Sequence, residues 1–247
     1  MDNQNIGFGI CCFGKEIYFK GTKAKLDYLL NNGHCCYVLT DNSDFFMQNF
    51  DGKNLHILPY GRFYRSYHDK ISIVKTIHKN HDIAILLDAD LNIKDYSALD
   101  KLVKFDYSDG VSYIDTLENH PGKFATVGEI PMDGIEWNEY VKYSNRIYSD
   151  INRIETIWEY FIVFNKQGFD ESKFFEDYER LQVAKEFCDV KLNKEVSGAG
   201  EGISIAISCL KNDIQISRDL RLSSLLNNVL KPITQHTPES EIPDYLK

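Results

Sequence analysis

The segment that most constrains this chain is residues 83–90, in which five apolar residues run straight into two aspartates separated by one alanine. A short apolar run of this length predicts a strand buried on both faces, in the middle of a parallel sheet. Ligands bind beyond the carboxyl ends of such strands, so Asp88 and Asp90 fall where a site is expected. Two neighbouring carboxylates repel each other unless something positive lies between them, and Mg²⁺ or Mn²⁺ is the natural candidate. An ordinary aspartate-rich turn at a strand end is the alternative.

Composition excludes several other classes of protein. A chain of 247 residues with 43% hydrophobic residues can bury a sizeable core and fits one large domain, with or without appendages. The formal net charge is −9 and no long basic run is present. These features argue against nucleic acid or an anionic membrane as the main partner, but leave room for a small anionic ligand.

The cysteines indicate a reducing compartment. None of the six forms a C-x-x-C pair, so a zinc site is not expected. Four of them form vicinal pairs inside apparent strands and are expected to pack as small core residues. With no visible secretory signal and no run long enough to cross a membrane, we predict a soluble, cytoplasmic protein, with loose peripheral membrane association left open. The six are Cys11, Cys12, Cys35, Cys36, Cys188 and Cys209.

The order of elements predicts the fold class. Strand and helix patterns alternate as far as residue 90, which indicates an α/β fold with a mixed, mainly parallel, Rossmann-like sheet flanked by helices in a single domain. Predicted strands there are 6–13, 34–40 and 55–58, with helices at 20–31 and 69–79. Beyond residue 90 we predict helices at 96–103, 137–153, 170–187 and 202–210, strands at 110–114 and 157–164, and a loop at 116–133.

Four stretches in the first hundred residues resemble metal-dependent, nucleotide-sugar glycosyltransferases of the GT-A fold. They are residues 13–18 (FGKEIY), residues 33–41 (GHCCYVLTD), the helix that begins near Lys70, and residues 88–90 (DAD). Taken together, they are similar to the retaining family that contains the blood-group A/B and α-1,3-galactosyl transferases. The resemblance implies a UDP-sugar donor, a manganese or magnesium ion, and transfer with retention.

The resemblance also implies roles for residues on the donor side. Phe13 and Tyr18 match positions that contact the uracil ring, and an aromatic ring at a strand end can stack on a base. Lys70 matches a basic residue beside the diphosphate. Arg62 and Arg65 are further phosphate candidates by charge and location alone, because guanidinium groups suit phosphate. Core packing is the alternative for the two aromatic residues, and a solvated helix face is the alternative for Lys70.

The expected metal ligands are Asp90 and Asp88, the latter with a ribose contact as its other role. His236 is a candidate third ligand from the C-terminal segment, where many GT-A enzymes carry one. Glu201 matches a carboxylate on the acceptor side of the sugar. It could stabilise an oxocarbenium-like transition state, form a short-lived glycosyl ester or hydrogen-bond the acceptor. A charge that complements the helix dipole is the alternative for Glu201.

The predicted activity is transfer of a hexose or N-acetylhexosamine from a UDP-sugar to a hydroxyl of a glycan or glycolipid. Residues 1–105 would form the donor half, residues 106–230 the acceptor and catalytic half, and residues 231–247 a tail or lid. A nucleotidyltransferase that makes NDP-sugars is one alternative, although the early glycine-rich segment lacks the basic residues its phosphate loop needs. A non-catalytic sugar- or nucleotide-binding module is the other. The oligomeric state stays open.

Overall fold

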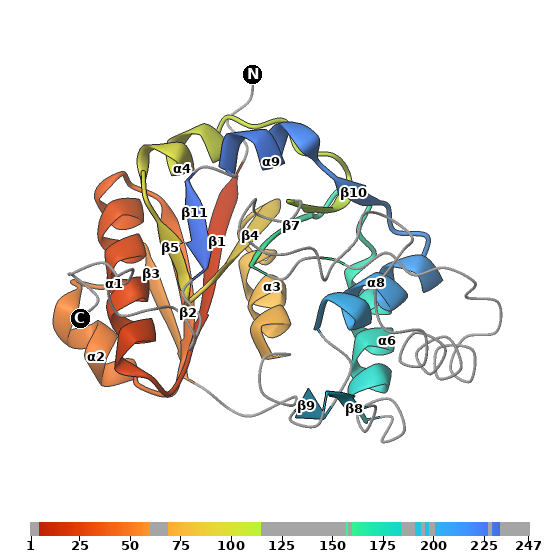
Figure 1. Cartoon of the computed structure of the whole chain (residues 1–247), viewed down its shortest axis with the longest axis horizontal. Helices are drawn as coiled ribbons and strands as arrows, with labels where there is room; N and C mark the ends of the chain where they lie inside the picture. Colours follow the sequence, from red (N-terminus) through yellow and green to blue (C-terminus); the bar gives the residue numbers. More distant parts are fainter. Residues whose placement is uncertain are drawn as a thin grey trace.

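A seven-stranded mixed sheet forms the centre of the molecule (Figure 1). The computed structural model describes residues 5–59, 69–114, 157, 160–183, 191–193, 196–197, 201–226 and 229–232. The strand order is β10-β6-β7-β4-β1-β2-β3, and of these seven described strands only β7 is antiparallel to its neighbours. The strands are β1 (Ile6–Cys12), β2 (Cys35–Thr40), β3 (Leu55–Pro59), β4 (Ile83–Asp88), β6 (Gly110–Tyr113), β7 (Phe161–Asn165) and β10 (Ile216–Arg218).

Helices cover both faces of the parallel half of this sheet. Helix α1 (Glu16–Asn31) contacts β1 and β2 from one side, and α3 (Ile71–Ile77) contacts β1, β2 and β4 from the other (Figure 1). The close approach of α3 depends on Gly9 of β1, where an added Cβ would lie 2.7 Å from Leu86 Cδ2 and 2.9 Å from Ile73 Cγ2. The β3-β2-β1-β4 order is the one found in a Rossmann-like half-sheet.

The remaining described helices extend the layers around this sheet. They are α2 (Ser43–Asn49), α4 (Ser97–Leu102), α6 (Glu171–Val183), α8 (Glu201–Lys211) and α9 (Leu220–Leu226). Helix α6 packs beside α3. Lys75 Nζ of α3 lies 3.0 Å from Glu179 Oε1 and 4.2 Å from the centroid of the Phe175 ring, both on α6. Helix α8 is joined to α6 through Lys211 and the buried Asp177, which are 2.6 Å apart.

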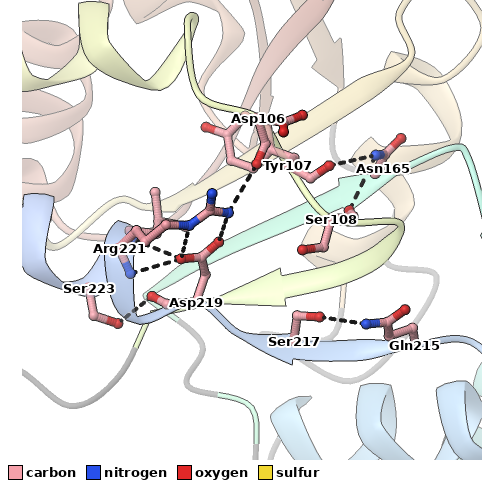
Figure 2. Close-up of polar contacts among 10 residues, drawn as sticks. Asp106, Tyr107, Ser108, Asn165, Gln215, Ser217, Asp219, Arg221 and Ser223 are labelled. Carbon is pink, nitrogen blue, oxygen red and sulfur yellow. Dashed lines mark hydrogen bonds and ion pairs between the residues drawn. The ribbon is translucent and has the colours of Figure 1, made fainter.

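Asp219 organises the start of α9. Its Oδ1 accepts hydrogen bonds from the backbone amides of Arg221 at 2.9 Å and Leu222 at 3.1 Å, which is the geometry of an N-cap. Figure 2 shows the Arg221 guanidinium between this carboxylate and the backbone oxygen of Asp106, to which it donates at 3.3 Å. The same guanidinium lies 5.0 Å from the centroid of Phe105, so this cluster fastens α9 to the segment that precedes β6.

Two small sheets complete the described structure. Strand β5 (Leu91–Ile93) leaves the central sheet directly after β4 and pairs antiparallel with β11 (Leu230–Pro232). Strands β8 (Lys191–Asn193) and β9 (Val196–Ser197) form the other pair. The predicted tail or lid therefore begins inside a strand, and its residues 233–247 lie outside the described part of the chain.

The predicted fold class is confirmed: a mixed, mainly parallel sheet flanked by helices. The buried apolar side chains form one continuous core, as expected of a single domain. No helix in the described part of the chain is both long and apolar enough to cross a membrane. Of the cysteines among the described residues, Cys12, Cys36 and Cys209 are buried as predicted, and Cys11 and Cys35 are partly buried.

Some predicted boundaries are wrong. Helix α1 begins at Glu16 rather than at residue 20, because Lys15 already has the extended backbone of an N-cap residue. Helix α2 was not predicted, although Asn42 caps it by accepting a hydrogen bond from the Phe45 amide at 3.2 Å. Strand β7 begins at Phe161 rather than at residue 157. The predicted loop 116–133 and helix 137–153 lie outside the described residues.

Candidate active site

The candidate site lies at the carboxyl edge of the parallel half of the sheet. Cys11 of β1 is in register with both Leu39 of β2 and Asp88 of β4, so the residues that follow these three strands emerge together. The loops after β1 and β2 are also joined directly, since the Gly14 amide donates to Asp41 Oδ1 at 3.4 Å. Ligands of open α/β sheets bind at this edge.

Lys70 pairs with the first aspartate of the site. Its Nζ lies 2.7 Å from Asp88 Oδ1, and the lysine side chain is only 5% exposed against 23% for the carboxylate. Lys70 reaches the aspartate because α3, which it precedes by one residue, begins at the carboxyl edge and runs back along the sheet to β4. Lys70 and Asp88 therefore lie together at this edge of the sheet, and the predicted contact of Lys70 with a diphosphate stays a prediction.

A second lysine, Lys25, approaches the same turn from the opposite face. It lies on α1, is 1% exposed, and donates from Nζ to the Ala89 carbonyl at 2.8 Å and to the Gly21 carbonyl at 3.3 Å. Ala89 stands between the two aspartates. The turn that carries both carboxylates is thus contacted by one buried ammonium group from α1 and by another from the start of α3.

Burial and charge both perturb this cluster. Burial lowers the pKa of Lys25 to about 8, against the opposing attraction of Asp90, Cys12 and Asp88. Burial, reinforced by the nearby charge of Asp88, raises the pKa of Asp90 well above its ordinary range, while Lys25 and Lys70 oppose that shift. A lysine with a lowered pKa near a carboxyl group with a raised pKa is typical of a functional site.

The donor set fits a hard divalent cation. Two carboxylates emerge from one strand end, and a bound cation would relieve the repulsion by Asp88 that adds to burial in raising the pKa of Asp90. Within the described residues no group of three His, Cys, Asp or Glu side chains is placed to hold a metal. Among the described residues, Asp88 and Asp90 are the two that would hold the cation, and its shell would be completed by phosphate or water oxygens or by a ligand from the rest of the chain.

The two aromatic residues predicted to contact a base flank the loop after β1. Phe13 directly follows the strand, and Tyr18 lies in the first turn of α1 with its ring 5.8 Å from Lys15 Nζ. Both rings are half-buried and pack against the core, so each combines a structural contact with some exposed surface.

Other predicted residues cannot be placed beside this cluster. Arg62, Arg65 and His236 lie outside the described residues. Glu201 is the first residue of α8, which confirms its predicted position at a helix start, and its side chain lies outside the described part of the structure.

Lys25 is the residue that the sequence analysis missed. The buried residues Thr22, Lys25, Leu26 and Leu29 follow the i, i+3, i+4, i+7 spacing of a helix face turned to the core. A lysine in that stripe, where an apolar residue is expected, was the available signal.

No protein-family model and no curated protein matches the chain. Similar solved structures include the galactosyltransferase LgtC in complex with donor and acceptor sugar analogues, at 9% identity and TM-score 0.47 over 86% of this chain and 72% of that one. A 4-diphosphocytidyl-2C-methyl-D-erythritol synthase from Anaerococcus prevotii DSM 20548 is similar at 11% identity and TM-score 0.46, over 88% and 87% of the two chains. The glycosyltransferase GlyE of Streptococcus pneumoniae TIGR4 is similar at 14% identity and TM-score 0.47, over 88% of this chain and 46% of GlyE. Likeness at this level carries no functional argument, so the interpretation below rests on the site itself and on the sequence motifs.

Proposed function

We propose that this chain is a cation-dependent glycosyltransferase that moves a hexose or N-acetylhexosamine from a UDP-sugar to a hydroxyl of a glycan or glycolipid, with retention. The observation that carries the proposal is the pair Asp88 and Asp90 at the carboxyl end of β4, where the buried Lys70 pairs with Asp88 and the buried Lys25 donates to the Ala89 carbonyl between the two aspartates. Mg²⁺ or Mn²⁺ bound there would offset the negative charge that grows on the departing nucleoside diphosphate.

The chain's own residues would bind and orient the donor. The ammonium group of Lys70 pairs with the Asp88 carboxylate at the carboxyl edge of the sheet. From there it would also contact a diphosphate bound beside Asp88. Phe13 and Tyr18 would contact the uracil ring from the loop after β1, and Arg62 and Arg65 would contribute further phosphate contacts. His236 would be a third ligand of the cation.

Glu201 is proposed as the catalytic carboxylate. It begins α8 directly after the sequence Ser-Gly-Ala-Gly, whose glycines allow a substrate to approach the backbone closely. In a retaining transfer a carboxylate beneath the sugar stabilises the positive charge that develops at the anomeric carbon. The acceptor hydroxyl then forms the new glycosidic bond on the face that the nucleotide leaves.

The proposed location is the cytoplasm. Three of the cysteines in the described residues, Cys12, Cys36 and Cys209, are buried as ordinary core residues. This usage suits a compartment in which thiols stay reduced.

A donor screen tests the proposal. The protein is incubated with UDP-galactose, UDP-glucose and their N-acetylhexosamine counterparts in manganese, and UDP release is measured against the same reactions in EDTA. We expect one donor to be hydrolysed in manganese and spared in EDTA. Release of pyrophosphate from UTP and a sugar phosphate would instead indicate a nucleotidyltransferase. A rise in melting temperature with UDP and manganese, without turnover of any donor, would indicate a binding module.

A further inference from the structure

Lys25 occupies a position that packing alone does not explain. Its side chain is 1% exposed, on the face of α1 that otherwise presents Leu26 and Leu29 to the sheet. Burying an ammonium group is costly, and apolar residues of similar volume often stabilise a buried position as well or better. The contacts of the ammonium group must therefore account for the lysine.

The ammonium group makes two hydrogen bonds, a longer one of 3.3 Å to the Gly21 carbonyl of its own helix and a shorter one that leaves the helix. Lys25 Nζ donates at 2.8 Å to the carbonyl of Ala89, the first residue after β4 and the residue between the two aspartates. At this point the chain leaves the central sheet and turns into β5, so the carbonyl has left the ladder of the seven-stranded sheet. A partly buried carbonyl without a donor would cost free energy, and the lysine supplies that donor.

We propose that Lys25 is a positioning residue, whose hydrogen bond to the Ala89 carbonyl fixes the turn 88–90 so that Asp88 and Asp90 face the same ligand. This inference rests on the proposed function, because it assigns Lys25 a task in donor binding. Lys70 holds the Asp88 carboxylate from the other face of the sheet, so the turn is held through its backbone on one side and through a side chain on the other. Lys25 itself contacts no substrate.

The role proposed for Lys25 predicts different effects on the two parts of a bound UDP, the diphosphate and the base. Fixing the turn aligns the carboxylates, so it affects binding that runs through a cation and the diphosphate. It has no direct effect on a base bound near Phe13. Loss of the hydrogen bond should therefore weaken UDP binding in manganese much more than UDP binding in EDTA.

Calorimetry of the whole chain with UDP tests this. Lys25→Met keeps an unbranched side chain that is one heavy atom shorter and removes the donor, and Lys25→Gln keeps an uncharged donor. Lys23→Met is the matched control, because Lys23 lies on the same helix, is 35% exposed and pairs with Asp27. We expect Lys25→Met to weaken UDP binding in manganese by about tenfold or more, with a much smaller change in EDTA. Lys25→Gln should recover part of the loss, and Lys23→Met should bind as the unmodified protein does.

The outcomes separate this inference from the proposed function. An unmodified protein that does not bind UDP in manganese overturns the proposed function and this inference with it. If the unmodified protein binds and Lys25→Met binds equally well, or loses the same factor in manganese and in EDTA, Lys25 is not a positioning residue. Loss of the cooperative melting transition in both Lys25 variants would also overturn the inference, since the lysine would then be part of the structural core.

Discussion

Lys70 Nζ lies 2.7 Å from Asp88 Oδ1, so a buried ammonium group and a carboxylate at the end of the fourth strand form one unit. An incoming diphosphate would meet a positive charge already held at the sheet edge, beside the carboxylate proposed to bind the cation. Because the lysine side chain is only 5% exposed, that charge is weakly screened by solvent.

Lys70→Met should therefore weaken UDP binding in manganese by about tenfold, because the variant leaves Asp88 without this counter-charge and removes a phosphate contact. Lys70→Arg should lose less UDP affinity, since arginine keeps the positive charge. Lys75→Met is the control on the same helix, where Lys75 pairs with Glu179 on a more exposed face. Titration calorimetry measures all three, and equal affinity in Lys70→Met would place the diphosphate elsewhere.

Asp90→Asn should lower UDP-sugar turnover by on the order of 100-fold or more, because it removes one of the two charges proposed to hold the cation. Asparagine has nearly the same volume, and removing one of two neighbouring like charges should leave the melting temperature unchanged or higher. Asp82→Asn, an exposed aspartate before the amino end of β4, is the control. Near-normal turnover of Asp90→Asn at limiting manganese would exclude this site for the metal.

UDP should bind more tightly than GDP or ADP. Phe13 and Tyr18 flank the loop after β1 with partly exposed rings, which suits stacking on a single pyrimidine. Phe13→Ala should reduce the preference for UDP, whereas Phe105→Ala, at an aromatic ring packed under Arg221, should not. Competition calorimetry with the three diphosphates decides the matter, and equal affinities would mean that the base is not read.

Glu201→Gln should cut transfer severely while leaving UDP affinity unchanged, because the proposed role of the carboxylate concerns the sugar rather than the nucleotide. Glu171→Gln is the matched control: Glu171 is the first residue of α6, as Glu201 is of α8, so it shares any contribution to a helix dipole. Rates of UDP release and of product formation measure the effect. The anomeric configuration of the product, read from proton NMR coupling constants, tests retention independently, and an inverted product would contradict it.

Asp219→Ala should lower the free energy of unfolding by about 1–2 kcal/mol, because it removes the N-cap of α9. For a chain of this size that corresponds to a fall in melting temperature of about 2–8 °C. Asp219→Asn keeps an acceptor oxygen, so its free energy of unfolding should fall less. Thermal melts at neutral pH compare the three proteins, and an unchanged Asp219→Ala would mean that α9 does not need this cap.

The same aspartate predicts a pH dependence. Burial alone would raise the pKa of Asp219, but hydrogen bonds from Arg221 and from the backbone of Leu222 and Arg221 outweigh it, so the folded pKa lies below the ordinary 3.8. A group with a depressed folded pKa stabilises the protein above its unfolded pKa, and this contribution is lost as the pH falls through the folded value. The stability difference between the unmodified protein and Asp219→Asn should therefore shrink below about pH 4. A constant difference would mean that the charge contributes nothing.

The sequence determined those parts of the protein that depend on local pattern. The apolar run 83–87 predicted a doubly buried strand with the two aspartates at its carboxyl edge, and β4 confirms the strand and the position of the aspartates. The helix predicted from residue 170 begins at Glu171, and Asp170 caps it by accepting a hydrogen bond from the Lys173 amide at 3.2 Å. These features involve neighbours within a few residues, where spacing and hydrogen-bonding capacity act directly.

Tertiary structure alone decided which groups from distant parts of the sequence contact the turn that carries the two aspartates. Lys25 is 64 residues from Ala89 in sequence, and nothing in its local pattern names that carbonyl as its partner. Likewise β5 is only three residues long and acquires its partner from β11, near the other end of the chain. Such pairings depend on how the helices and strands pack together. A buried ammonium group needs a hydrogen-bond acceptor, and a short strand needs a partner strand, and in both cases the partner lies far away in the sequence.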